Sequence, residues 1–205
     1  MDTDIIVIVP ARRDSKRLPH KNKMLLHGVP LWENSVNIAK KAGIKNIIVS
    51  TNDEEILSTK VEGVMMLERS KQNATDEATT TDVIYEVIQF IEATGIKYKT
   101  IALLQPTSPL LEPHTLRHAL HQFQDKSMRC LIAYNQQYKP CGAFYIFRYS
   151  EFAFYGNSIY GIDNSHIYIL PPEQAIDVDE LWDWRAAQDV KAGRVINPES
   201  FTRGL

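Results

Sequence analysis

A basic segment near the N-terminus carries the residue types that bind phosphate groups. Residues 12–23 contain six Arg or Lys side chains and one acidic residue, a charge of +5 in a 205-residue chain whose net charge is −2. Arg12 offers a planar fork of donors to phosphoryl oxygens, whereas Lys16 and Lys21 act as point charges. Because the segment directly follows an apolar, strand-like run, we interpret it as a phosphate-binding loop rather than a solvated basic surface.

This loop differs from the common nucleotide-binding motifs. Residues 10–22 contain no glycine. The segment therefore matches neither the G-x-x-x-x-G-K-[ST] pattern of P-loop proteins nor the G-x-G-x-x-G fingerprint of dinucleotide-binding proteins. The sequence disfavours a kinase, an ATPase or an NAD-dependent enzyme.

A pair of aspartates near the C-terminal end could hold a divalent cation. Asp177 and Asp179 are two residues apart, so in an extended segment both side chains point the same way. Proteins commonly hold Mg²⁺ with one or two carboxylates together with substrate phosphates. The alternative is that either aspartate caps the helix expected to begin near Glu180. A basic phosphate-binding loop in the same chain favours the metal site.

The apolar patterns predict an α/β fold that brings these segments together. Short apolar runs at 5–9, 46–50, 64–67 and 100–104 are typical of strands buried on both faces of a parallel sheet. Helical patterns alternate with them and begin near residues 31, 53 and 80. This alternation predicts one domain over residues 1–205, with a Rossmann-like, mostly parallel sheet and helices on both faces.

The segments after these four strands are polar and charged, and ligands of such sheets bind beyond the carboxyl ends of the strands. One of them places Gln105 at a strand end, where Pro106 and Pro109 fix the turn. From residue 130 onward, aromatic strand-like runs predict further strands, at least one of them antiparallel at the sheet edge, and residues 181–190 return to a helix.

Composition limits the class of protein. No stretch approaches the run of about 20 apolar residues that spans a bilayer, and the near-neutral charge argues against a nucleic-acid or membrane partner. Two cysteines, Cys130 and Cys141, cannot form a disulfide framework or a four-ligand zinc site. We therefore expect a cytoplasmic protein.

Six motifs, in order along the chain, resemble the CMP-N-acetylneuraminic acid synthetase (acylneuraminate cytidylyltransferase) family. The first is the loop from Val9-Pro10-Ala11-Arg12 through Ser15-Lys16-Arg17-Leu18-Pro19-His20-Lys21-Asn22, which resembles the family's signature. The others are Ser50-Thr51-Asn52-Asp53 with Leu67-Glu68-Arg69, then Ala74-Thr75-Asp76-Glu77-Ala78-Thr79, Leu104-Gln105-Pro106-Thr107-Ser108-Pro109-Leu110, Gly142-Ala143-Phe144-Tyr145-Ile146 and Ile176-Asp177-Val178-Asp179.

The resemblance implies that CTP and a sialic-acid-like nonulosonic sugar (N-acetylneuraminate, legionaminate or a related acid) give the CMP-sugar and pyrophosphate with Mg²⁺. It implies that Arg12 and Lys21 are catalytic and grip the triphosphate, and that Asp177 and Asp179 hold the metal, with one of them, assigned as Asp179, helping to deprotonate the sugar hydroxyl. It assigns further nucleotide contacts to Ala11, Lys16, Asn22, Arg69, Ala78, Thr79 and Thr80, and sugar contacts to Gln105, Lys139 and Cys141.

Two departures from the family leave alternatives open. Lys139-Pro140-Cys141 stands where the family usually has Arg-Pro-Asn, and only residues 135–141 remain where sialic acid synthetases carry a long dimerisation insertion. The protein would then form a homodimer by a different interface, stay monomeric, or use a sugar that needs no lid from a neighbour. Alternative functions are a nucleotidyltransferase for an eight-carbon acid sugar of the CMP-Kdo type, another sugar nucleotidyltransferase, and a non-catalytic nucleotide-binding relative.

Overall fold

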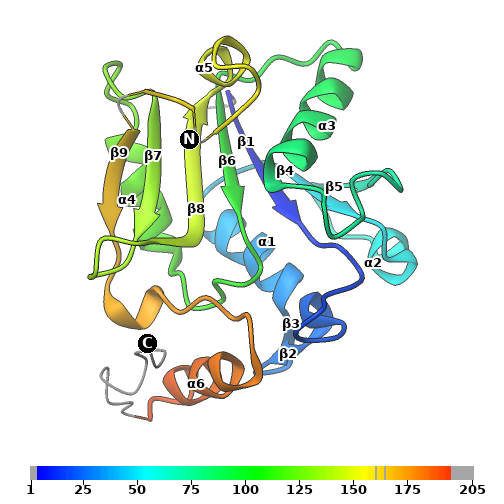
Figure 1. The fold of residues 1–205 in the computed structure, drawn as a ribbon, viewed down its shortest axis with the longest axis vertical. Helices are drawn as coiled ribbons and strands as arrows, with labels where there is room; N and C mark the ends of the chain where they lie inside the picture. Colours follow the sequence, from blue (N-terminus) through cyan, green and yellow to red (C-terminus); the bar gives the residue numbers. More distant parts are fainter. Residues whose placement is uncertain (1–3, 160, 164, 195–205) are drawn as a thin grey trace.

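A seven-stranded sheet forms the centre of the molecule (Figure 1). The computed structural model describes residues 4–159, 161–163 and 165–194. The strands lie in the order β5-β4-β1-β6-β8-β7-β9, and a separate ribbon pairs β2 with β3. The strands are β1 Ile5–Pro10, β2 Leu25–Leu26, β3 Val29–Pro30, β4 Asn46–Thr51, β5 Val64–Glu68, β6 Thr100–Leu104, β7 Cys130–Tyr134, β8 Pro140–Arg148 and β9 Ser165–Ile169.

Helices cover both faces of the sheet, as the sequence predicts. On one face, α1 and α4 pack against Val7 and Val9 of β1, and on the other, α3 and α5 pack in a cluster with Ile6 and Ile8. The helices are α1 Leu31–Lys41, α2 Glu54–Ser58, α3 Thr80–Ala93, α4 Pro113–Gln122, α5 Tyr149–Phe154 and α6 Leu181–Lys191, with 3-10 turns at Lys21–Lys23 and Pro172–Gln174. Each described helix is too short or too polar to cross a membrane.

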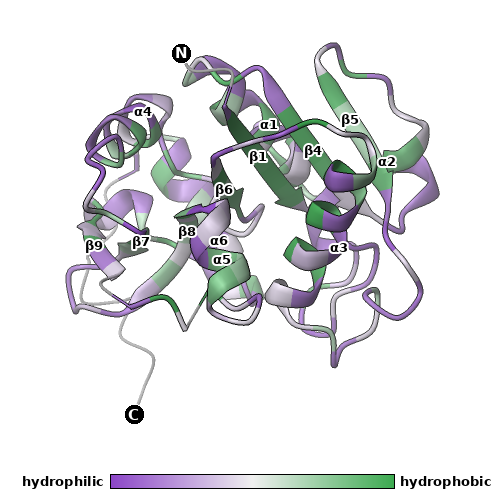
Figure 2. Ribbon diagram, turned by 90° about the horizontal axis from the view of Figure 1, so that it is seen from above, coloured by the Kyte–Doolittle hydropathy of each residue, from purple (hydrophilic) through white to green (hydrophobic). Residues whose placement is uncertain are grey.

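The central strands are apolar on both faces because both faces are covered. β1 pairs in parallel with β4 and with β6 along its two edges, and helices cover its two faces, so Ile5 to Val9 are buried. Figure 2 shows this as hydrophobic colouring along β1 and β4, while the connecting loops are largely hydrophilic. The carboxyl ends of these parallel strands meet at one edge of the sheet, where the polar loops lie.

The position predicted for the antiparallel strand is wrong. β8 is antiparallel to both β6 and β7, but it lies between them, and the edges of the sheet are β5 and β9. β8 is buried over most of its length, and such a strand needs a neighbour on each side. A tight turn over residues 135–139 joins β7 to β8, with the Asn135 amide donating to the Lys139 carbonyl. The connection is therefore even shorter than the seven residues expected from the sequence.

Candidate functional site

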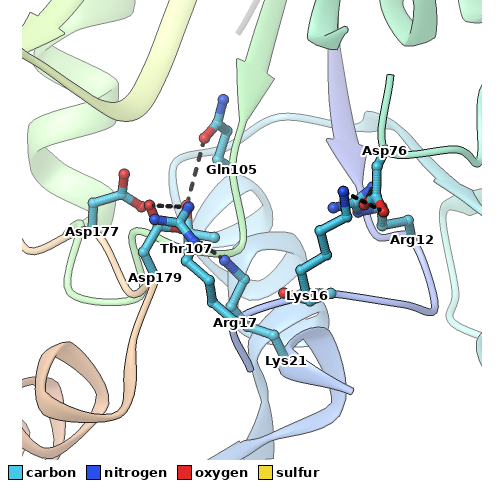
Figure 3. A pocket seen from close by; sticks show the side chains of 10 residues that line it. Arg12, Lys16, Arg17, Lys21, Asp76, Gln105, Thr107, Asp177 and Asp179 are labelled. Carbon is cyan, nitrogen blue, oxygen red and sulfur yellow. Dashed lines mark hydrogen bonds and ion pairs between the residues drawn. The ribbon is translucent and has the colours of Figure 1, made fainter. Parts of the chain in front are cut away.

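A polar pocket of about 400 Å³ opens at the carboxyl ends of the central strands (Figure 3). It is built from three of the four loops predicted to converge there, those after β1, β5 and β6, together with the extended segment before α6. The lining side chains belong to Arg12, Ser15, Lys16, Arg17, Lys21, Asp76, Gln105, Thr107, Asp177 and Asp179.

An apolar cluster holds the basic loop against the acidic segment. Leu18, from the loop after β1, and Val178, from between the two aspartates, are buried in the same cluster, which also contains Trp184 of α6. The Lys21 ammonium donates to the Val178 carbonyl at 2.9 Å and lies 3.0 Å from Asp179 Oδ1. Burying the residues between the charged ones therefore fixes the charged side chains on the pocket side.

Asp177 is a desolvated carboxylate that fits a divalent cation. Its Oδ1 atom is buried and has no hydrogen-bond partner among the described residues. Burial raises the pKa of Asp177 to about 6, against a hydrogen bond from Thr107 that lowers it. A carboxylate that lines a polar pocket and has one oxygen without a partner among the described residues is a suitable ligand for a hard cation, which prefers oxygen. Asp179, on the same wall, would be the second ligand.

Neither aspartate caps α6, so the alternative role in capping is excluded. The N-cap is Glu180, and the Asp183 carboxylate accepts the backbone amides of Asp179 at 2.9 Å and Glu180 at 2.7 Å. Asp179 instead uses its carboxylate in the pocket, where Oδ2 lies 2.7 Å from an Arg17 nitrogen. Both aspartate side chains are thus left to the pocket.

On the opposite wall, Asp76 bridges two of the basic side chains predicted to hold phosphate. Its oxygens lie 2.9 Å from Arg12 Nη1 and 3.0 Å from Lys16 Nζ. The Lys16 hydrogen bond is the main reason why the pKa of Asp76 lies below its usual range. Arg12 also donates to the Thr75 carbonyl at 3.1 Å. Asp76 thus occupies the cations that a phosphate group would use.

Replacing Asp76 with asparagine should therefore strengthen anion binding. The Asp76→Asn side chain no longer competes for Arg12 and Lys16, so we expect pyrophosphate to bind a few-fold more tightly, the scale of an exposed ion pair. Titration calorimetry with pyrophosphate measures the effect, and Glu77→Gln, an exposed neighbour outside the pocket, is the control. Weaker binding to the Asp76→Asn protein would show instead that Asp76 orients the two cations.

Two predicted nucleotide contacts serve the loop framework in this structure. Asn22 is buried, and its amide donates to the Arg12 carbonyl at 2.8 Å, which ties the end of the loop to its beginning. Arg69 is 6% exposed and donates to the Ser50 hydroxyl at 3.2 Å and to the Ser50 carbonyl at 2.9 Å. Burial is the main reason why the pKa of Arg69 is lowered to about 10. Both residues lie outside the pocket lining.

Six further predicted contacts also lie outside the pocket lining, whereas Lys16 and Gln105 belong to it. Thr79 caps α3 in a capping box with Asp82, Ala78 precedes it, and Thr80 begins the helix. The remaining three residues are Ala11, which is fully buried, Lys139, which is exposed in the β7–β8 turn, and Cys141, which packs in the apolar cluster under α1 and α4. Burial is the main reason why the pKa of the Cys141 thiol rises to about 11.

Four lining residues carry no predicted role: Ser15, Arg17, Asp76 and Thr107. Arg17 and Asp76 belong to the sequence motifs described above, and their charges could have indicated a position in the pocket. Thr107 is placed by the chain itself, since its carbonyl accepts the Val178 amide at 2.6 Å and its hydroxyl lies 3.5 Å from Gln105 Oε1. The bond between Val178 and Thr107 joins the loop after β6 to the acidic segment, and no local sequence pattern predicts it.

A mostly parallel α/β sheet with this pocket at its carboxyl edge defines the Rossmann-like fold of nucleotide-sugar transferases. A solved structure described as CMP:2-keto-3-deoxy-manno-octonic acid synthetase complexed with CTP superposes with a TM-score of 0.66, at 16% identity, over 92% of this chain and 98% of that one. A Mycobacterium tuberculosis protein solved as a complex with manganese gives a TM-score of 0.62, at 14% identity, over 91% and 98%. At these identities the likeness concerns the fold.

The chain belongs to the cytidylyltransferase family, whose model matches residues 6–148. It is 38% identical over 133 residues to CMP-N,N'-diacetyllegionaminic acid synthase of Legionella pneumophila. The matched region spans 60% of this chain and 56% of that protein. It is 30% identical over 165 residues to pseudaminic acid cytidylyltransferase of Campylobacter jejuni, over 78% and 68%. The match to the Legionella protein thus spans little more than half of that relative.

Proposed function

We propose that this protein transfers the CMP group of CTP to an acidic, sialic-acid-like sugar and releases pyrophosphate. The observation that carries the proposal is the pocket of a cytidylyltransferase-family chain, where Arg12 and Lys16 lie across from the carboxylates of Asp177 and Asp179, and Lys21 contacts Asp179. The two relatives named above act on legionaminic and pseudaminic acids, which favours this sugar class over an eight-carbon acid.

In the reaction, the anomeric hydroxyl oxygen of the sugar bonds to the α-phosphorus as the bond from that phosphorus to the pyrophosphate oxygen breaks. The basic residues neutralise the charge that builds on the departing pyrophosphate. The hydroxyl proton must pass to a base. One of the two carboxylates that line the pocket, Asp177 or Asp179, would accept it. Gln105 lies where it can orient the sugar.

Asp177 and Asp179 are the residues that would hold Mg²⁺. When bound, the ion supplies positive charge to the reacting phosphate and lowers the pKa of an oxygen that it contacts. The Oδ1 atom of Asp177, which has no hydrogen-bond partner in the part of the chain that the structure describes, supports this assignment. The two-carboxylate set also matches the usual way in which proteins hold Mg²⁺ together with substrate phosphates.

A nucleotide-binding experiment and a turnover experiment test the two halves of the proposal. By calorimetry, CTP should bind at least about tenfold more tightly than ATP, GTP or UTP, because base-edge hydrogen bonds discriminate strongly. With CTP and Mg²⁺, a panel of nonulosonic acids should yield pyrophosphate. Equal binding of all four nucleotides would refute CTP as the substrate. CTP binding without turnover of any acid sugar would favour the non-catalytic alternative.

A further inference from the structure

The proposed reaction needs a cation for the sugar carboxylate, and the predicted sugar contacts do not provide it in the pocket. Lys139 is exposed in the β7–β8 turn, outside the pocket lining, and Cys141 is buried in the apolar core. We propose that Arg17 binds the carboxylate of the sugar and thereby selects an ionised acid as substrate. This inference rests on the proposed function, which supplies the acidic sugar.

The basic side chains of the pocket fall into two groups (Figure 3). Arg12 and Lys16 form ion pairs with the Asp76 carboxylate, with N–O distances of 2.9 and 3.0 Å. Arg17 and Lys21 form ion pairs with the Asp179 carboxylate, with N–O distances of 2.7 and 3.0 Å. Arg12 and Lys16 stand on one side of the pocket. Arg17 and Lys21 stand on the other side, together with Gln105 and Asp177. The two groups therefore suit two different anions.

Within the second group, Arg17 is the side chain that is available to a ligand. The Lys21 side chain is 11% exposed and is held by the Val178 carbonyl as well as by Asp179. Arg17 is 53% exposed, and its guanidinium reaches into the pocket from the same loop. An exposed ion pair of this kind contributes little stability, so a ligand can replace Asp179 as its partner at low cost.

The chemistry of the guanidinium fits a carboxylate ligand. Its planar donors match the two oxygens of a carboxylate in a bidentate arrangement, which an ammonium cannot form. The structure already places the Arg17 guanidinium against one carboxylate, that of Asp179. An acidic sugar presenting its carboxylate to Arg17 would have its other polar groups near Gln105 and Thr107, which line the same pocket.

Kinetics with two Arg17 variants separate sugar binding from nucleotide binding. For Arg17→Gln we expect the KM for the sugar to rise about tenfold or more, as for the loss of a charged hydrogen bond, while the KM for CTP stays within about twofold. Arg17→Lys keeps the charge without the fork and should fall between. The control is Arg13→Gln, since Arg13 is exposed in the same loop beside Asp14 and outside the pocket lining.

A modified substrate identifies the group that Arg17 contacts. The carboxamide of the preferred sugar should bind more weakly than the acid to the wild-type protein by calorimetry, and about equally to Arg17→Gln. Equal discrimination by both proteins, or a loss of CTP binding in Arg17→Gln without a sugar effect, overturns the assignment while the proposed function stands. A wild-type protein that turns over no acidic sugar refutes the proposed function, and the assignment with it.

Discussion

Replacing Asp177 with asparagine should remove turnover and, at the same time, make the metal-free protein more resistant to heat. The asparagine has nearly the same shape but lacks the charge that would hold the cation, and we expect kcat to fall by about 100-fold or more. The gain in stability has a different cause. Burial disfavours the ionised Asp177 and raises its pKa to about 6, whereas a neutral amide carries no such penalty.

The sign of the pH dependence follows from that raised pKa. The folded protein binds the Asp177 proton more tightly than the unfolded chain does, so unfolding releases it. The contribution of Asp177 to the free energy of unfolding of the metal-free wild type therefore falls as the pH rises from about 4 to about 6. In Asp177→Asn this contribution disappears, and thermal melts at pH 4 and pH 7 compare the two proteins.

Added Mg²⁺ gives an independent readout of the same variant. The ion should raise the melting temperature of the wild type by mass action and leave that of Asp177→Asn almost unchanged. Asp189→Asn is the matched control, because Asp189 undergoes the same chemical change on α6, where it pairs with Arg194 outside the pocket lining. Wild-type turnover by Asp177→Asn would contradict the assignment of this carboxylate to the metal.

The strands of this fold are predictable because their burial is uniform. A strand that is covered on both faces must be apolar at successive positions, and β1, β4 and β6 show this in the sequence as plainly as in the structure. The order of the later strands is not encoded in this way. β7, β8 and β9 are all apolar or aromatic runs, and the insertion of β8 between β6 and β7 depends on long-range pairing that no local pattern states.

The candidate site is predictable where chemistry alone identifies a residue. Charged or polar residues from the loops after β1 and β6 and from the segment before α6 are brought together as expected, namely Arg12, Lys16, Lys21, Gln105, Asp177 and Asp179. Their catalytic and binding roles stay predictions.

The positions of Asn22 and Arg69 are set by the tertiary structure. The Asn22 amide binds the Arg12 carbonyl across its own loop, and Arg69 binds Ser50, which the fold supplies from β4. Cys141 differs again, since the thiol enters the apolar core from its position on β8. In each case the structure places the residue outside the pocket lining, and its predicted ligand contact stays a prediction.

Adding one methyl group at Gly142 should damage the sugar side of the pocket more than the fold. Gly142 has a φ of +75°, and a Cβ atom there would stand 3.0 Å from Gln105 Oε1 and 3.6 Å from Asp177 Oδ2. The left-handed backbone costs an alanine about 1–2 kcal/mol. In addition, Gln105 must shift to make room, and we expect kcat/KM for the sugar to fall by about tenfold or more, since small misplacements in a site reduce rates strongly.

Gly95→Ala separates the backbone strain from the crowding. Gly95 has a φ of +74°, almost the same as that of Gly142, but a Cβ atom there would meet no atom of the described residues within 4 Å. Both variants should therefore lose similar stability in denaturant melts, and only Gly142→Ala should lose turnover once the folded fraction is equal. If Gly95→Ala lost as much kcat/KM as Gly142→Ala, the contact between Gly142 and Gln105 would have no special role. Because the two φ values are so close, the difference in kcat/KM between Gly142→Ala and Gly95→Ala measures how precisely Gln105 and Asp177 must be positioned.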